Sequence, residues 1–203
     1  MTIASTRSLI NAPGEPAWEI ALLFPMQGAW NEDEYLALDT NLLVEFTNGN
    51  VEVLPVPTDR HQAMVGFLYV LLAAFAQRVG GIVRMAPLRV RVGPKKYREP
   101  DLVFVSAEDD PRRQNPYWIG ADLVIEVVSR DGEERDWVQK RIDYAQAGIG
   151  EYWIVDPQQE VIVVLRLTAD HYAEHGVFVR GQTVTSARWF DLTTMVDHVL
   201  DAK

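Results

Sequence analysis

Two acidic residues stand inside short apolar runs of this sequence, where carboxylates are uncommon. Asp101 follows Pro100 and opens the run 101–105, and Glu126 interrupts the run 122–128. Each run is short, rich in β-branched residues and bounded by turn formers, which is typical of a buried strand. A carboxylate there must be hydrogen-bonded, paired with a cation or bound to a metal, because little water reaches it. Two such acids, joined by a polar loop, predict neighbouring strands that deliver oxygens to one divalent metal ion.

Lys140 follows the second run on a predicted helix and supplies the cation that phosphodiester chemistry needs nearby. Magnesium takes one or two carboxylates and keeps several waters, one of which can serve as the nucleophile. The three side chains together therefore favour a metal-dependent nuclease that uses Mg²⁺ or Mn²⁺. Other interpretations stay open for each residue. Lys140 lies four positions after Asp136 and could form an exposed helix pair, Asp101 could satisfy a turn, and Glu126 could pair with an arginine.

Length and composition fit one globular domain. The chain has 203 residues, of which 48% are apolar and 24% charged, and it is long enough to bury a substantial core. The absence of cysteine excludes disulfides, thiolate zinc sites and thiol catalysis. No apolar stretch approaches the roughly 18 residues of a membrane span, and no secretion signal is evident, so we expect no membrane contact and a cytoplasmic location.

The net charge of −10 opposes binding to a phosphate backbone. A local basic rim would offset it, and nine of the 19 basic residues fall between positions 95 and 141, around the two acids. An ordinary solvated loop surface explains the same distribution equally well.

The pattern of apolar residues and turn formers predicts the order helix, hairpin, helix, strands, helix, strands. A capping box at Asn31 opens a short helix, and an Asn48-Gly49 turn joins two strands. Longer helices are expected after Pro57, ending at Gly80, and over 134–147; further strands over 82–85, 88–92, 151–155, 161–167 and 176–184; and a terminal helix over 192–200. This order predicts an α/β fold with a mixed central sheet in a single domain, residues 29–203, preceded by an irregular arm, residues 1–28.

The motifs resemble the Uma-two family, which belongs to the PD-(D/E)XK nuclease superfamily. The resemblance is carried by Pro100-Asp101, by the run from Leu123 to Ser129 around Glu126, and by the spacing of Asp136, Lys140 and Tyr144 before the stretch 147–157. It extends upstream to Glu45 and to His61-Gln62, and it covers roughly residues 29–200.

The resemblance implies a restriction-endonuclease-like fold, a mixed central sheet flanked by helices, and metal-dependent hydrolysis of phosphodiester bonds, with DNA as the expected substrate. It implies that Asp101 and Glu126 are metal ligands and that Glu45 is an upstream acid that completes the site. One departure is that Val128 stands where the superfamily pattern has a lysine. Lys140 is expected to replace it from the following helix. A site role for His61 is a weaker expectation.

Three rival interpretations remain. The first is a nuclease-fold module with weak or no activity that binds nucleic acid or a protein partner, which the acidic balance and the displaced lysine favour. The second is a structural protein whose acids are buried ion pairs with Arg89, Arg91 or Arg98. The third, a metal-free hydrolase of sugars with paired carboxylates, does not explain the lysine. Because nucleases that cut both strands commonly act in pairs, we also expect a homodimer.

Overall fold

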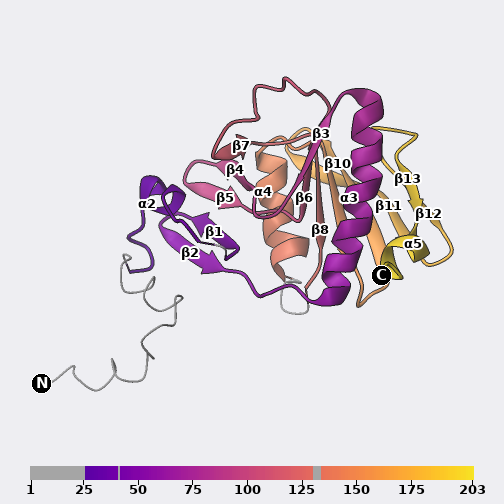
Figure 1. Ribbon diagram of the computed structural model, residues 1–203, viewed down its shortest axis with the longest axis horizontal. Helices are drawn as coiled ribbons and strands as arrows, with labels where there is room; N and C mark the ends of the chain where they lie inside the picture. Colours follow the sequence, from indigo (N-terminus) through magenta and orange to yellow (C-terminus); the bar gives the residue numbers. More distant parts are fainter. Residues whose placement is uncertain (1–25, 41, 130–133) are drawn as a thin grey trace, which may run out of the picture.

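The computed structural model describes residues 26–40, 42–129 and 134–203 (Figure 1). Nearly all of the predicted arm, residues 1–28, therefore lies outside the described residues. The helices are α2 (Glu32–Leu36), α3 (Asp59–Val79), the π-helical turn η2 (Arg135–Gln139), α4 (Lys140–Gln146) and α5 (Val196–Leu200). The strands are β1 (Val44–Thr47), β2 (Asn50–Val53), β3 (Ile82–Met85), β4 (Arg89–Gly93), β5 (Lys96–Arg98), β6 (Leu102–Val105), β7 (Tyr117–Ile119), β8 (Leu123–Val127), β9 (Glu151–Asp156), β10 (Val161–Thr168), β11 (His171–Val179), β12 (Thr183–Thr185) and β13 (Thr193–Met195).

A six-stranded mixed sheet with the order β11-β10-β9-β8-β6-β3 forms the centre of the fold. Its one parallel pair is β8 with β9, and the connection between them runs through η2 and α4. The other neighbours pair antiparallel, including β6 with β8. Strands β6, β8 and β9 are buried along their whole lengths, which explains their near-continuous apolar sequences.

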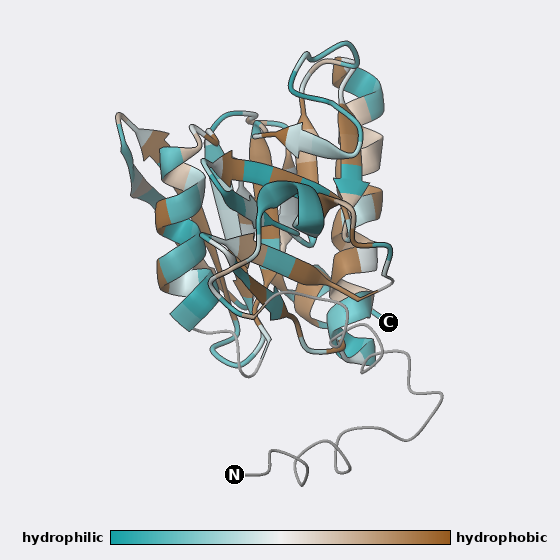
Figure 2. Ribbon diagram, turned by 90° about the vertical axis from the view of Figure 1, so that its left-hand side faces the viewer, coloured by the Kyte–Doolittle hydropathy of each residue, from teal (hydrophilic) through white to brown (hydrophobic). Residues whose placement is uncertain are grey.

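Helices cover both faces of this sheet, and alternate side chains of each strand point to opposite sides. Leu123, Ile125 and Val127 of β8 pack in the same core cluster as α3. Val124 and Val128 pack in the opposite cluster, which contains Tyr144 of α4. Figure 1 shows α3 and α4 as the two long helical segments beside the strands, and in Figure 2 apolar colouring runs along the central strands. Glu126 therefore faces the α4 side of the sheet.

A second sheet, with the order β2-β1-β5-β4-β7, lies on the N-terminal side of the centre and carries its own aromatic cluster. Its strand β1 pairs with both β2 and β5. The pair β12 and β13 forms a third, two-stranded sheet. The α/β fold and the mixed central sheet are thus confirmed, whereas the separate five-stranded sheet was not predicted.

Most of the predicted local signals are confirmed. The capping box at Asn31 is present on α2, since the Asn31 side chain accepts from the Glu34 backbone and the Glu34 side chain accepts from the Asn31 backbone. Asn48 and Gly49 both have positive φ, at 49° and 85°, as the tight turn between β1 and β2 requires. Thr58 caps α3, and Gly80 ends it in the left-handed conformation.

Helix α3 is long and apolar enough, by length and composition, to cross a membrane. Six of its residues are buried against the central sheet: Met64, Val65, Leu68, Leu72, Phe75 and Ala76. Core packing therefore accounts for its apolar character.

The sequence misplaced several short elements. Strands β5 and β7, each three residues long, were missed because their polar or turn-rich surroundings hide them. The strand expected over 176–184 begins earlier, at His171, and the terminal helix expected from residue 192 begins at Val196, after β13.

Candidate active site

Asp101 and Glu126 come together on adjacent strands of the central sheet. Leu102 of β6 pairs with Ile125 of β8 in antiparallel register, so Asp101, one residue before Leu102, stands opposite Glu126, one residue after Ile125. The backbone N–H of Val127 donates to Asp101 Oδ2 at 2.8 Å and fixes this carboxylate against β8. The prediction that neighbouring strands deliver the two acids is therefore confirmed.

Lys140 reaches the same point from the junction of η2 and α4. Its Nζ lies 2.8 Å from Glu126 Oε1 and 3.1 Å from Asp136 Oδ1. The i,i+4 pair with Asp136 exists, but Lys140 and Asp136 are both only 2% exposed, so it is not a surface pair. The hydroxyl of Tyr144, one turn further along α4, also donates to Glu126 Oε1.

Glu45 lies on β1 beside this group, and basic and backbone groups hold both of its oxygens. Oε2 accepts from Arg98 Nη1 at 2.7 Å, while Oε1 accepts from the Glu99 N–H at 3.2 Å and lies 3.6 Å from Lys140 Nζ. Arg98 also donates twice to Asp143 Oδ2. Glu45 thus links the second sheet to the lysine, and its role as a metal ligand stays a prediction.

The rival interpretation, in which the buried acids pair with arginines, applies to Glu45. It applies to neither Asp101 nor Glu126. Among the described residues, Arg98 pairs with Glu45 and Asp143, Arg89 with Glu99, and Arg91 with Glu32. None of these three arginines forms an ion pair with Asp101 or Glu126 in that part of the chain.

His61, in the first turn of α3, anchors Asp101 from the other side. Its Nε2 lies 3.2 Å from Asp101 Oδ2 and 3.0 Å from the Val127 carbonyl oxygen. Both neighbours are acceptors, so we infer that Nε2 carries the proton. Its Nδ1 is buried without a hydrogen-bond partner among the described residues. Burial opposes charging of the imidazole, but Asp101 and Val127 outweigh it, so the pKa of His61 is raised.

The site holds more carboxylates than one ammonium can neutralise. Burial raises the pKa of Glu126 to about 8, with Asp101 and Asp136 adding to the effect and Lys140 opposing it. For Glu45, burial is outweighed by Lys140 and Arg98, and the pKa is lowered. The pKa of Lys140 is raised despite its burial, because Glu126, Glu45 and Asp136 surround it. A further positive charge would allow Glu126 to ionise.

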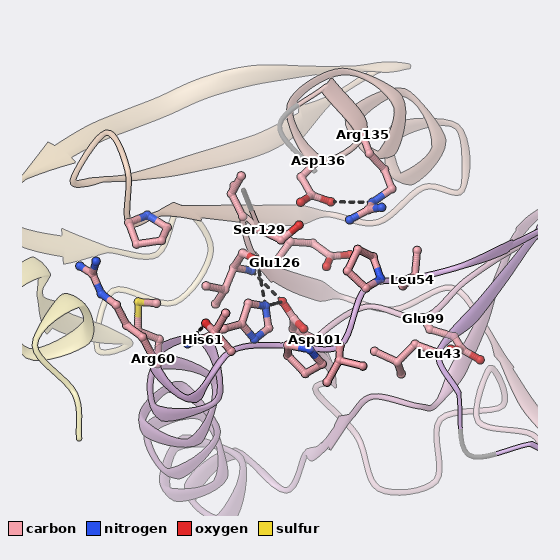
Figure 3. A pocket seen from close by; sticks show the side chains of 18 of the residues that line it. Leu43, Leu54, Arg60, His61, Glu99, Asp101, Glu126, Ser129, Arg135 and Asp136 are labelled. Atoms are coloured by element: carbon pink, nitrogen blue, oxygen red, sulfur yellow. Dashed lines mark hydrogen bonds and ion pairs between the residues drawn. The ribbon is translucent and has the colours of Figure 1, made fainter. Parts of the chain in front are cut away.

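A cavity of about 600 Å³ adjoins the site. Asp101, Glu126 and Lys140 line its polar side, and the segment that leads from β2 into α3 lines the other. Figure 3 shows Asp101 and His61 below Glu126, Arg135 and Asp136 above it, and the apolar side chains of Leu43 and Leu54 to the right. Glu45 is not among the lining residues.

The described residues fit a metal ion held by two carboxylates. No hydrogen bond from the described part of the chain reaches Asp101 Oδ1 or Glu126 Oε2, and both acids line the cavity. In residues 26–40, 42–129 and 134–203, no group of three His, Asp or Glu side chains is placed to hold a metal ion. Two carboxylates with retained waters are a normal Mg²⁺ site, whereas Glu45 would first have to leave Arg98.

Several contacts of the site escaped sequence reasoning. Arg98 and Asp143 lie near the motifs, but their pairing brings together positions 45 apart in sequence on β5 and α4, and no local pattern shows it. Tyr144 is a fully buried core residue, and its hydroxyl also orients Glu126. The spacing of four residues between Lys140 and Tyr144 was a usable signal, since it places both on one helix face.

Comparison with solved structures first shows which fold this chain shares. A crystal structure described as that of "a putative nuclease belonging to DUF820" from Anabaena variabilis superposes with a TM-score of 0.70. It is 20% identical in sequence, and the match covers 87% of this chain and 98% of that one. Residues 32–196 match the Uma2 family, described as "putative restriction endonuclease". The chain belongs to this family, which confirms the resemblance seen in the motifs, and no curated protein matches it.

Proposed function

We propose that this protein is a Mg²⁺-dependent endonuclease that hydrolyses phosphodiester bonds in DNA. The observation that carries the proposal is the position of Asp101 opposite Glu126 on β6 and β8, with Lys140 Nζ 2.8 Å from Glu126. Membership of the Uma2 family and the nuclease fold support nucleic acid hydrolysis in general. The metal and the choice of DNA are proposals that rest on the chemistry of the site.

Asp101 Oδ1 and Glu126 Oε2 would hold the metal ion, because the other oxygen of each acid is already engaged by protein groups. When bound, Mg²⁺ neutralises phosphate charge and lowers the pKa of a coordinated water. Val127 and His61 keep Asp101 in place, and the Tyr144 hydroxyl does the same for Glu126. Lys140 stabilises negative charge that develops on the phosphate oxygens.

The alternative is a nuclease-fold module that binds nucleic acid or protein without cutting. The observation that favours it is the commitment of Lys140 to three buried carboxylates, which leaves its ammonium fewer protons to donate to a phosphate. Retained metal binding without cleavage would identify this case.

The test is cleavage of end-labelled DNA in MgCl₂ and in EDTA. We expect cleavage only with the metal, and the variants Asp101→Asn and Glu126→Gln should lose it by at least about 100-fold. Asp191→Asn serves as the control, because Asp191 forms an exposed pair with Arg78 on the surface. Wild-type rates in either site variant would refute the proposal. Calorimetric titration with MnCl₂ separates the alternative, which predicts metal binding with no cleavage.

We further propose that the protein works as a homodimer in the cytoplasm. Light scattering at micromolar concentration tests the first part, and a monomeric mass would contradict it. Cell fractionation tests the second.

A further inference from the structure

The cavity beside the two acids has one polar side and one apolar side. The apolar side is formed by side chains from the end of β2, the following segment, α3 and the residue before β1: Leu43, Leu54, Pro55, Val56, Pro57 and Met64. Figure 3 shows Asp101 and Glu126 to the left of Leu43 and Leu54, and Lys140 also lines the cavity. A substrate that brings a phosphate to the acids therefore meets apolar side chains within the same 600 Å³ cavity.

The largest apolar surface near a phosphate in a nucleic acid is the face of a base, which the sugar connects to the phosphate. In a duplex this face is stacked on its neighbours and cannot reach a protein wall beside the phosphate. A base in a single strand is free to pack on apolar side chains, as happens where enzymes bind unpaired nucleotides.

The cations around the site also favour a single-stranded substrate, because most of them form ion pairs or hydrogen bonds within the protein. Five of the basic residues expected to form a rim are in ion pairs: Lys96, Arg98, Arg112, Arg135 and Lys140. Two more donate to backbone oxygens, Arg113 to Glu108 and Arg141 to Tyr172. Arg130 lies outside the described residues, and Lys95 is exposed and forms no ion pair with the described acids.

Arg60 differs from these residues, because it lines the cavity, is exposed and forms no ion pair with the described acids. With a net charge of −10 in addition, the described surface offers few contacts for the phosphates of a duplex. One or two phosphates near Arg60 match what this cavity provides.

We propose that the substrate is a single-stranded DNA segment, whose unpaired base packs against the apolar side while its phosphate meets Asp101 and Glu126. This inference rests on the proposed nuclease function and narrows its substrate. It predicts that a single strand or a duplex with an overhang is bound and cut in preference to a blunt duplex.

The test is fluorescence anisotropy with a fluorescein-labelled single strand, its blunt duplex and the duplex with an overhang, with CaCl₂ replacing MgCl₂. We expect the single strand and the overhang to bind at least about 10-fold more tightly than the blunt duplex. Each phosphate contact on a single strand contributes a slope of about −0.7 to log K against log salt. Contacts to one or two phosphates therefore predict a slope shallower than about −2.

Two variants test the apolar side directly. Val56→Asn should weaken single-strand binding without affecting folding, because Val56 is 86% exposed. Leu54→Asn should weaken it further, and both should keep wild-type affinity for MnCl₂. Val70→Asn is the matched control, since Val70 is 67% exposed on α3 and lies outside the cavity lining.

Equal or tighter binding of the blunt duplex, a slope steeper than about −5, or unchanged binding in both Val56→Asn and Leu54→Asn would overturn the single-strand inference. Cleavage of duplex DNA with Mg²⁺ would then still support the nuclease function. Absence of cleavage on every substrate, together with absence of Mn²⁺ binding, would instead refute the nuclease proposal itself.

Discussion

Lys140 and Glu126 form a buried ion pair in which Nζ lies 2.8 Å from Oε1, and the same Nζ faces two further carboxylates, those of Asp136 and Glu45. One ammonium therefore lies beside three acids in a space that water hardly reaches, while Arg98 also pairs with Glu45 and Arg135 with Asp136. Such an arrangement costs free energy in a protein that only has to fold, because buried charges are expensive to desolvate. Its presence at the junction of β8, β1 and α4 points to a functional constraint.

Removing this ammonium should strongly destabilise the protein. Lys140→Met leaves Glu126 buried without its cation, and such a loss typically costs about 3–5 kcal/mol. Urea denaturation in EDTA measures the loss. Arg78→Met is the control, because the Arg78–Asp191 pair is roughly half exposed on both sides and should contribute at most about 1 kcal/mol.

The double variant Lys140→Met/Glu126→Gln distinguishes loss of the Lys140–Glu126 ion pair from poor packing of the methionine side chain. Since the neutral amide needs no cation, the double variant should be more stable than the sum of the two single changes predicts, most clearly above pH 8, where Glu126 would ionise. Strict additivity would show that Lys140 and Glu126 do not stabilise one another.

His61 should act on metal binding through Asp101. His61→Ala removes the hydrogen bonds to Asp101 Oδ2 and the Val127 carbonyl, and loss of such a support typically weakens metal affinity by 10- to 100-fold. Titration with MnCl₂ measures it, and His61→Gln, which retains an N–H donor, should recover part of the loss. His175→Ala, at an exposed position on β11, is the control. A purely structural histidine would lower the melting temperature and leave the Mn²⁺ affinity unchanged.

The central part of the site was predictable because its residues are adjacent to strong local patterns. Asp101 and Glu126 interrupt β6 and β8, whose apolar sequences identify both strands, and the helical spacing placed Lys140 behind them. The pairing of Arg98 with Asp143 was not predictable, because it depends on how the second sheet approaches α4, and that sheet includes the three-residue strands β5 and β7. Whether a basic residue is free or paired is likewise decided by tertiary contacts.

The stability of the metal-free protein should fall as the pH rises from about 4.5 to about 8. Burial raises the pKa of Glu99 to about 7 and that of Glu126 to about 8 in the folded state, from 4.5 for the ordinary side chain. A raised carboxyl pKa means that the folded protein binds more protons, so this contribution is complete below pH 4.5 and is lost as the pH passes the folded pKa.

Chemical denaturation between pH 4.5 and 9 in EDTA tests this dependence. Glu126→Gln should flatten the profile near pH 8, and Glu99→Gln should flatten it near pH 7. Glu174→Gln, at an exposed position on β11, should keep the wild-type profile. Stability that rises steadily between pH 5 and 8 would contradict the raised pKa values. At the acid end the direction reverses, because the lowered pKa of Glu45 makes stability fall as the pH drops below about 4.5.

The sequence predicts Glu45 as a third metal ligand, whereas in the structure other protein groups already contact both of its carboxylate oxygens. From these contacts we expect Glu45→Gln to weaken Mn²⁺ binding less than Asp101→Asn does, while lowering stability through the loss of charge beside Arg98 and Lys140. Thermal unfolding with MnCl₂ gives both quantities. A metal ion at 100 times its Kd stabilises a protein by about 2.7 kcal/mol, which is roughly 5–10 °C in Tm for a chain of this size. Asp101→Asn should abolish this rise and Glu45→Gln should retain most of it. Equal losses in the two variants would mean that Glu45 leaves Arg98 and joins the metal as a third ligand.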